Sequence, residues 1–189
     1  MVEMSQFADI PHLMAPVVTD MNHAAGILEW TVGKMEERYE LFRSTGVRDI
    51  LGYNSLGEEA IFAKLNPVDD AAKARIPKKL PYMVFVIDEL ADLMLTNKEV
   101  ETHIVRIAQK ARAVGIHLVL ATQRPQANVV TGLIKANMPC RIGFKVASGM
   151  DSRIVLDQKG AELLLGQGDM MVVTPSGSGE LRRCQGTLV

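Results

Sequence analysis

Long apolar stretches are missing from the sequence. No segment approaches the roughly 18 uninterrupted apolar residues that a membrane-spanning helix needs. The first residues, MVEMSQFADIPH, also lack the basic and then apolar layout of a secretory signal peptide. Apolar residues make up 48% of the chain and charged residues 23%, a balance typical of globular proteins. We therefore expect a soluble, cytoplasmic chain without a membrane segment.

Cysteine is scarce as well. Cys140 and Cys184 lie far apart and belong to no CxxC motif or Cys/His cluster, and the four histidines show no ligand spacing. This pattern indicates a reducing compartment and argues against a disulfide scaffold or a structural zinc site.

A phosphate-binding GxxxxGK[ST] loop is absent from the printed sequence. Such a loop cradles phosphates with its backbone amides and reaches the terminal phosphates through its lysine. The pair Gly33-Lys34 is followed by methionine within a predicted helix, and Lys159-Gly160 has the reverse order. The printed chain therefore has no standard motif of its own for holding a nucleoside triphosphate.

Acidic residues are nearly missing from one part of the chain. Residues 103–153 hold eight lysines and arginines against a single acid, Asp151, whereas residues 1–102 hold seventeen acids and ten bases. Such a basic segment is either a solvated face or a surface that binds a polyanion. Charge alone leaves both interpretations open.

Helix and strand patterns alternate along the chain, which is typical of an α/β fold. Apolar residues recur every three or four positions after residue 20 and predict a long helix that ends by Gly46. A similar stripe predicts a second helix that ends by Gly115. Short apolar runs predict strands at 83–87 and 116–122, and we expect the second strand to be covered on both faces.

The remaining segments predict smaller elements. Residues 52–81 are rich in turn formers and charge, and they predict a surface connection with one short helix. The last third predicts a helix near 129–136, a strand near 141–146, short helices within 151–165, and a closing pair of strands at 169–174 and 181–189.

Two adjacent acids, Asp88 and Glu89, follow the first predicted strand. Ligands of an open parallel sheet bind outside the carboxyl ends of its strands. At such a place an Asp can hold the water shell of Mg²⁺, and a following Glu can polarise an attacking water. The alternative is that one of the two acids caps the helix that begins at LADLM.

Thr122, Gln123 and Arg124 end the second predicted strand, so we expect them at the same edge of the sheet. Their side chains can donate to a γ-phosphate or orient water. The alternative is a polar turn that Pro125 closes.

Six segments, in order along the chain, resemble the motor domain of the FtsK/SpoIIIE double-stranded DNA translocases. They are IPHLMAPVVTDM, GKMEERYELFRSTGVRDILGYN, FVIDELADLM, RIAQKARAVGIHLVLATQRPQ, VVTGLIKANMPCRIGFKVASGMDSRIVLD and GAELLLGQGDMMV. The resemblance implies a RecA-like P-loop NTPase core with a mostly parallel sheet flanked by helices. Since the family's phosphate-binding loop lies upstream of the segment matching MVEMSQF, residues 1–189 would form one partial motor domain, truncated at its N-terminus.

The resemblance also implies roles for individual residues. Asp88 and Glu89 would be the Walker B pair, with Asp88 holding Mg²⁺ through water. Gln123 falls at the sensor position and, with Thr122, would lie near the nucleotide. The helix MEERYELF offers Arg38 as an arginine that acts on the nucleotide of a neighbouring subunit.

The basic segment receives an assignment from the same resemblance. In the family, loops after the TQR strand and around the DSR motif face DNA in the pore. Here these loops contain Arg124, Lys135 and Arg153, which we expect to bind double-stranded DNA.

For the complete protein, the resemblance implies an ATP- and Mg²⁺-dependent hexameric ring that pumps double-stranded DNA during chromosome segregation and cell division. Long relatives are often tethered to the inner membrane by an N-terminal region that is absent here. We expect the isolated chain to be inactive as an ATPase, because it lacks the phosphate-binding loop. Two alternatives stay open: a nucleotide-independent DNA-binding or regulatory protein, and a related ring ATPase that moves protein or conjugative DNA.

Overall fold

The computed structural model describes residues 3–175 and 179–187. The chain divides into two compact units, and its assignment to one partial motor domain stays a prediction. Unit 1 consists of Met1–Asp88 and Thr96–Ala121, and unit 2 consists of Glu89–Leu95 and Thr122–Val189.

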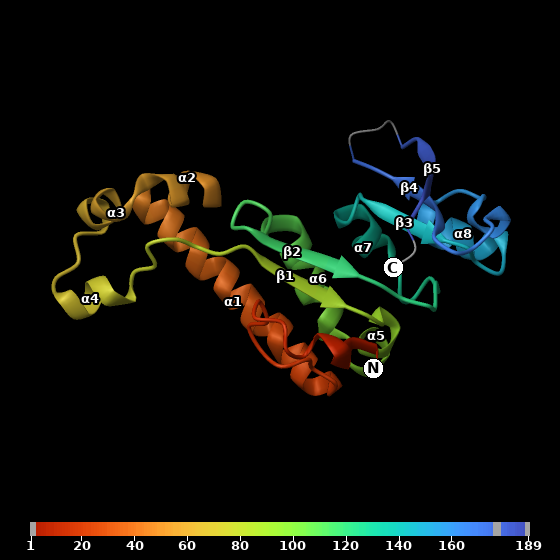
Figure 1. Ribbon diagram of the computed structural model, residues 1–189, viewed down its shortest axis with the longest axis horizontal. Coiled ribbons are helices and arrows are strands. Elements are labelled where there is room, and N and C mark those ends of the chain that lie inside the picture. The colour runs from red at the N-terminus through yellow and green to blue at the C-terminus, as the bar shows by residue number, and fades with distance from the viewer. Residues whose placement is uncertain (1–2, 176–178, 188–189) are drawn as a thin grey trace. The chain divides into compact units, whose positions relative to one another are not determined.

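Helix α1 (Met21–Thr45) is the longest element of unit 1 (Figure 1). Asp20 caps its first turn by accepting a hydrogen bond from the amide of His23. Gly46 ends the helix in the left-handed conformation, with φ of 69°, as the sequence predicted. Within the described residues, no helix is both long and apolar enough to cross a membrane.

Three short helices follow α1, where sequence analysis expected one. Two of them have N-terminal caps, because Asp49 accepts from the amide of Gly52 and Asp69 from that of Ala72. Residues that resembled turn formers in the sequence therefore act as helix caps. The three helices are α2 (Ile50–Leu56), α3 (Glu58–Leu65) and α4 (Asp70–Arg75).

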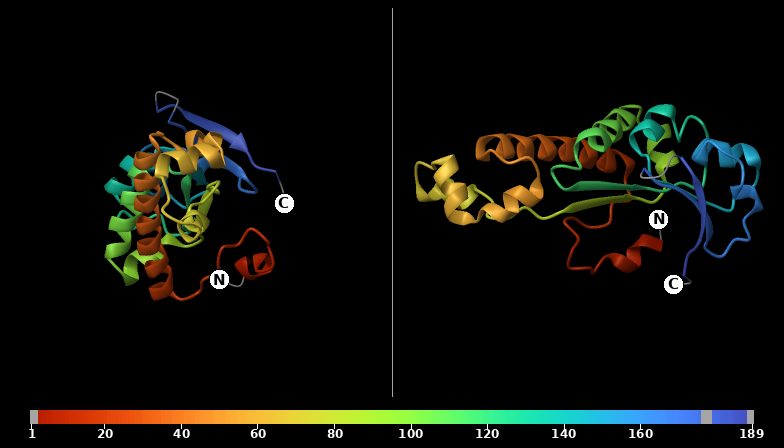
Figure 2. Two further views of the ribbon diagram at one scale, coloured as in Figure 1. Left: turned by 90° about the vertical axis from the view of Figure 1, so that its left-hand side faces the viewer. Right: turned by 90° about the horizontal axis from the view of Figure 1, so that it is seen from above.

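Two parallel strands form the sheet of unit 1. β1 (Met83–Ile87) pairs with β2 (Ile116–Leu120) in a register that aligns Met83 with Ile116 and Ile87 with Leu120. Helices α1 and α6 (Glu99–Lys110) lie side by side over one face of this pair (Figure 2).

The other face of the strand pair is exposed, so the prediction that β2 is covered on both faces is wrong. Val84 and Val86 of β1 are 61% and 56% exposed, and Val119 of β2 is 50% exposed. A continuous apolar run indicates that a strand favours burial. It does not show that other residues of the same chain bury it.

Gly115 connects α6 to β2, and any other residue would be strained at this position. Its φ is 74°, and a Cβ there would lie 2.4 Å from the Cδ1 atom of Ile50. The predicted apolar stripe of the helix is confirmed, since Val100, Ile104 and Ile107 are buried. The helix ends at Lys110, earlier than predicted, and a turn leads to Gly115.

Arg38 is buried on α1 and connects this helix to both strands. Its side chain donates to the carbonyl of Val114 at 2.6 Å and to that of Pro81 at 2.8 Å. These carbonyls precede β2 and β1, and only 7% of the residue is exposed. Burial lowers the pKa of Arg38, and the two carbonyls compensate for its desolvation.

Unit 2 contains a three-stranded antiparallel sheet in the order β3-β4-β5, which confirms the predicted closing pair of strands (Figure 1). The connection of that pair includes residues 176–178, which lie outside the described residues. The strands are β3 (Arg141–Phe144), β4 (Asp169–Val173) and β5 (Leu181–Gln185).

The other short elements of the described residues are η1 (Glu3–Phe7), α5 (Leu90–Thr96), α7 (Gly132–Asn137), α8 (Gly149–Leu156) and η2 (Ala161–Leu163).

A small apolar core lies on one face of this second sheet. Its buried members are Leu156, Ala161, Leu164 and Val173. Gly143 permits close packing, because a Cβ at this position would lie 2.9 Å from the Cδ1 atom of Leu156. Helix α8 therefore rests directly on β3.

Asp169 begins β4 and holds the preceding loop. Only 4% of the residue is exposed, and its carboxylate accepts two hydrogen bonds from Arg183 at 2.9 and 2.7 Å. The amide of Leu165 donates a third bond at 2.7 Å. The Arg183 bonds and then the Leu165 bond lower the pKa of Asp169 to about 2.

We predict that Arg38→Met destabilises the chain by about 2 kcal/mol, because the carbonyls of Val114 and Pro81 lose their charged donor. Urea unfolding of the parent and the variant measures this difference. Arg43→Met is the matched control on the same helix, since the Arg43 side chain is 78% exposed. Equal unfolding midpoints for parent and Arg38→Met would contradict the structural role of Arg38.

We also predict a pH-dependent effect of Asp169→Asn. A carboxyl whose pKa is lowered by folding stabilises the protein above its ordinary pKa of 3.8, and this stabilisation is lost as the pH falls through about 2. The variant should therefore melt below the parent at pH 6, and the gap should narrow as the pH falls toward 2. Thermal unfolding between pH 6 and pH 2 tests this, with the exposed Asp70→Asn as control. A gap that stays constant with pH would refute it.

Candidate functional site

The carboxylate of Glu89 receives three hydrogen bonds within unit 2. The hydroxyl of Thr122 and the amide of Ala91, at 3.1 Å, donate to Oε1, and the amide of Gln123 donates to Oε2 at 3.0 Å. Because α5 begins at Leu90, the bond from Ala91 is a helix-cap interaction. The helix-cap alternative considered for this pair of acids is therefore correct for Glu89.

The electrostatics of Glu89 combine two opposing influences. Partial burial raises the pKa of its carboxyl, but the bonds from Thr122, Gln123 and Ala91 and the charge of Arg124 outweigh burial. The pKa therefore lies below its ordinary value, and Glu89 is ionised at neutral pH. The three donors compensate for the cost of desolvating its charge.

Residues 122–124 form a tight polar turn after β2, as the second alternative predicted. The Thr122 hydroxyl oxygen accepts a hydrogen bond from the amide of Arg124 at 3.1 Å. The Arg124 side chain is exposed, and its Nη1 atom lies 3.9 Å from Oδ1 of Asp92 on α5. The turn therefore contacts residues 89–92 at two places, at Glu89 and at Asp92.

Asp88 ends the first segment of unit 1 and follows β1 directly, and the residue is exposed. No cluster of three or more His, Cys, Asp or Glu side chains suited to a metal ion occurs within residues 3–175 and 179–187. A single exposed carboxylate fits Mg²⁺, because this ion keeps several waters and is bound by few protein oxygens.

Lys135 and Arg141 share one carboxylate, that of Asp157. Lys135 Nζ lies 2.6 Å from one Asp157 oxygen, and an Arg141 guanidinium nitrogen lies 2.5 Å from the other. These bonds lower the pKa of Asp157. The prediction that Lys135 binds DNA did not include Asp157, because no local pattern connects residues that are 22 positions apart.

Arg153 is exposed on α8, whose first turn is closed by a capping box. In this box the Ser148 hydroxyl accepts from the amide of Asp151, and the Asp151 carboxylate accepts from the amide of Ser148. The acid of the DSR motif is therefore a helix cap, and the arginine is left on the surface.

Arg38 is not part of this site. Its guanidinium is buried in unit 1 and bonds to two carbonyls of its own chain. That it acts on the nucleotide of a neighbouring subunit stays a prediction, and such a role would require the guanidinium to leave these two carbonyls. The mixed charged and apolar sequence MEERYELF could not distinguish a buried arginine from an exposed one.

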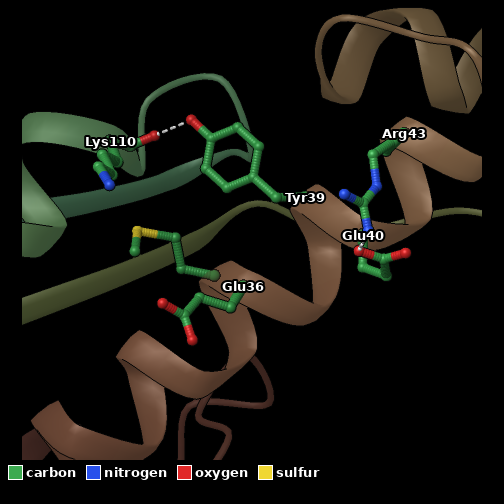
Figure 3. A pocket seen from close by; sticks show the side chains of 6 residues that line it. Glu36, Tyr39, Glu40, Arg43 and Lys110 are labelled. Carbon is green, nitrogen blue, oxygen red and sulfur yellow. Dashed lines mark hydrogen bonds and ion pairs between the residues drawn. The ribbon is translucent and has the colours of Figure 1, made fainter.

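A hollow of about 380 Å³ lies in unit 1, on the surface of α1 and at the end of α6 (Figure 3). The Tyr39 hydroxyl donates to the Lys110 carbonyl, Arg43 pairs with Glu40, and Glu36 pairs with Arg106. These polar groups are already bonded to one another, so the hollow is a weaker candidate for a functional site than the surroundings of Glu89. Its lining residues are Met35, Glu36, Tyr39, Glu40, Arg43 and Lys110.

Comparison with known families gives a match that covers residues 1–127. The matching family model is described as the FtsK/SpoIIIE family. This confirms the resemblance found in the sequence.

A curated relative supports the same assignment over the whole chain. The chain is 55% identical over 194 aligned residues to the protein named DNA translocase FtsK 2 of Ralstonia nicotianae, and the alignment covers 100% of the chain and 25% of the relative. The chain is thus much shorter than the curated relatives it matches.

Solved structures confirm the predicted fold class. The conjugation coupling protein TcpA of pCW3, determined in monomer form with ATPγS, matches 90% of this chain and 45% of its own, with 28% identity and a TM-score of 0.73. The cytoplasmic domain of the type VII secretion ATPase EccC of Thermomonospora curvata matches 88% of this chain and 18% of its own, with 24% identity and a TM-score of 0.67. The fold is therefore that of a P-loop ATPase domain.

Proposed function

The chain belongs to the FtsK/SpoIIIE family, and we propose that it is part of an ATP-driven motor that moves double-stranded DNA. In this proposal the complete protein forms a hexameric ring on the cytoplasmic side and acts in chromosome segregation and cell division. The observation that supports it best is the Glu89 site, where an ionised carboxylate is held against a turn that carries an exposed arginine.

The two acids have different tasks in this proposal. Asp88 would hold Mg²⁺ through water, and the ion, when bound, neutralises charge on the phosphates. Glu89 would polarise the attacking water, and Gln123, whose backbone amide bonds to Glu89, would act as the sensor residue. The printed residues contain no GxxxxGK[ST] motif, so these two acids do not by themselves hold the phosphates.

DNA binding is assigned to the basic residues of unit 2. Arg124 and Arg153 are exposed and can meet phosphates directly. Lys135 can do so only by exchanging its partner Asp157 for a phosphate. Contacts to the uniform backbone suit a motor that has to move over any sequence.

A second candidate is a motor that moves conjugative DNA or protein. It is favoured by the likeness to TcpA, a conjugation coupling protein. The identity to TcpA is 28%, against 55% to the relative named DNA translocase, so a DNA translocase motor is the better-supported candidate.

We predict that Glu89→Gln in the full-length protein slows ATP hydrolysis by about 100-fold or more, because it removes the group that polarises water. Nucleotide affinity should change little, since the Asp88 carboxylate is retained, whereas Asp88→Ala should weaken both binding and turnover. Steady-state phosphate release and nucleotide titration measure these effects. Glu99→Gln, on α6, is the matched control. Parent-like turnover of Glu89→Gln would refute the assignment.

We further predict that Arg124→Ala weakens binding to unrelated duplexes equally and reduces the slope of log affinity against log salt by about one. The reason is that a lost phosphate contact releases one counterion fewer. Titration of several duplexes over a salt series measures this effect in the full-length protein, after sedimentation has verified assembly. Arg43→Ala serves as the control for an exposed arginine on α1. An assembled variant with unchanged affinity and slope would exclude Arg124 from the DNA-binding surface.

A further inference from the structure

We propose that Thr122 is a positioning residue that restrains Glu89 until DNA engages Arg124, so that the turn 122–124 couples DNA contact to ATP hydrolysis. The inference rests on the proposed function, because it requires that Glu89 acts on water and that Arg124 contacts DNA. It goes further, since it assigns the coupling between the two events to particular hydrogen bonds.

The first step concerns the availability of the Glu89 carboxylate. A carboxylate has about four sites for accepting hydrogen bonds, and three of them are used here by Thr122, Gln123 and Ala91. A residue that polarises water has to direct a lone pair at that water. The arrangement seen here therefore holds Glu89 against the protein and limits its access to a substrate water.

The second step identifies Thr122 as the adjustable part of this restraint. The bonds from Ala91 and Gln123 come from backbone amides, whereas the bond from Thr122 comes from a side-chain hydroxyl. The same hydroxyl oxygen accepts the amide of Arg124 at 3.1 Å. Thr122 thereby joins the backbone of Arg124 to the carboxylate of Glu89 through one atom.

The third step concerns how DNA would act on this connection. The Arg124 guanidinium lies 3.9 Å from Asp92, and the two side chains are 59% and 43% exposed, so this ion pair holds Arg124 only weakly. A phosphate accepts two parallel hydrogen bonds from a guanidinium and is a stronger partner. When Arg124 turns toward a phosphate, its amide is drawn from Thr122, and the hold of the hydroxyl on Glu89 loosens.

If Thr122 had a productive role instead of a restraining one, Thr122→Val would change the DNA-free ATPase rate in the opposite direction. If Thr122 held Glu89 in its productive orientation, removal of the hydroxyl would slow hydrolysis both with and without DNA. The sign of the change in the DNA-free rate therefore distinguishes restraint from productive positioning.

The test compares Thr122→Val with Thr122→Ser in the full-length protein. Valine keeps the shape of the side chain without the hydroxyl, and serine keeps the hydroxyl. We expect Thr122→Val to raise the DNA-free ATPase rate by about tenfold, the population shift that corresponds to one lost charge-assisted hydrogen bond. The ratio of DNA-stimulated to DNA-free rate should fall accordingly, with KM for ATP and DNA affinity unchanged, and Thr122→Ser should retain the parent ratio.

Two outcomes overturn the inference. One is a Thr122→Val protein with the parent stimulation ratio, and the other is a rate that falls in both conditions. Should Thr122→Val fail to fold, as judged by circular dichroism, Thr122→Ala is measured in its place with the same expectations. A parent protein without ATPase activity or DNA binding would instead refute the proposed function, so the two failures are distinguishable.

Discussion

The parallel pairing of β1 with β2 is the constraint on which the site depends. Its register sets Ile87 opposite Leu120, so the two strands end at the same level. Glu89 and Thr122 are each two residues beyond these ends, and they meet in a hydrogen bond. A slip of one residue would change which residues lie opposite one another at the strand ends and would separate Glu89 from Thr122.

At the Glu89 site, the same three hydrogen bonds stabilise the local structure and set the properties of the carboxylate. A partly buried carboxylate needs donors, and the start of α5 and the turn after β2 provide them. These donors also lower the pKa of Glu89 and define the direction of its oxygens. The helix-cap and polar-turn alternatives are therefore correct descriptions of the local structure, and they are compatible with a role in hydrolysis.

The sequence predicted those features that depend on local periodicity or on strand ends. The stop at Gly46, the strand at 83–87 and the approach of Glu89 to Thr122 follow from helix capping, an apolar run and the geometry of parallel strands. It did not predict that Asp157 binds Lys135, because such pairs depend on how distant segments pack. The exposed face of β2 was missed for the same reason, since composition does not identify what covers a strand.

The buried Arg38 has a consequence for the order in which unit 1 folds. Its two acceptor carbonyls lie 43 and 76 positions further along the chain, so α1 is synthesised before either of its partners. Contacts of such high sequence separation form late, because a large loop has to close before they are gained. Until then the guanidinium keeps this face of the nascent helix hydrated, which an apolar residue at position 38 would not do.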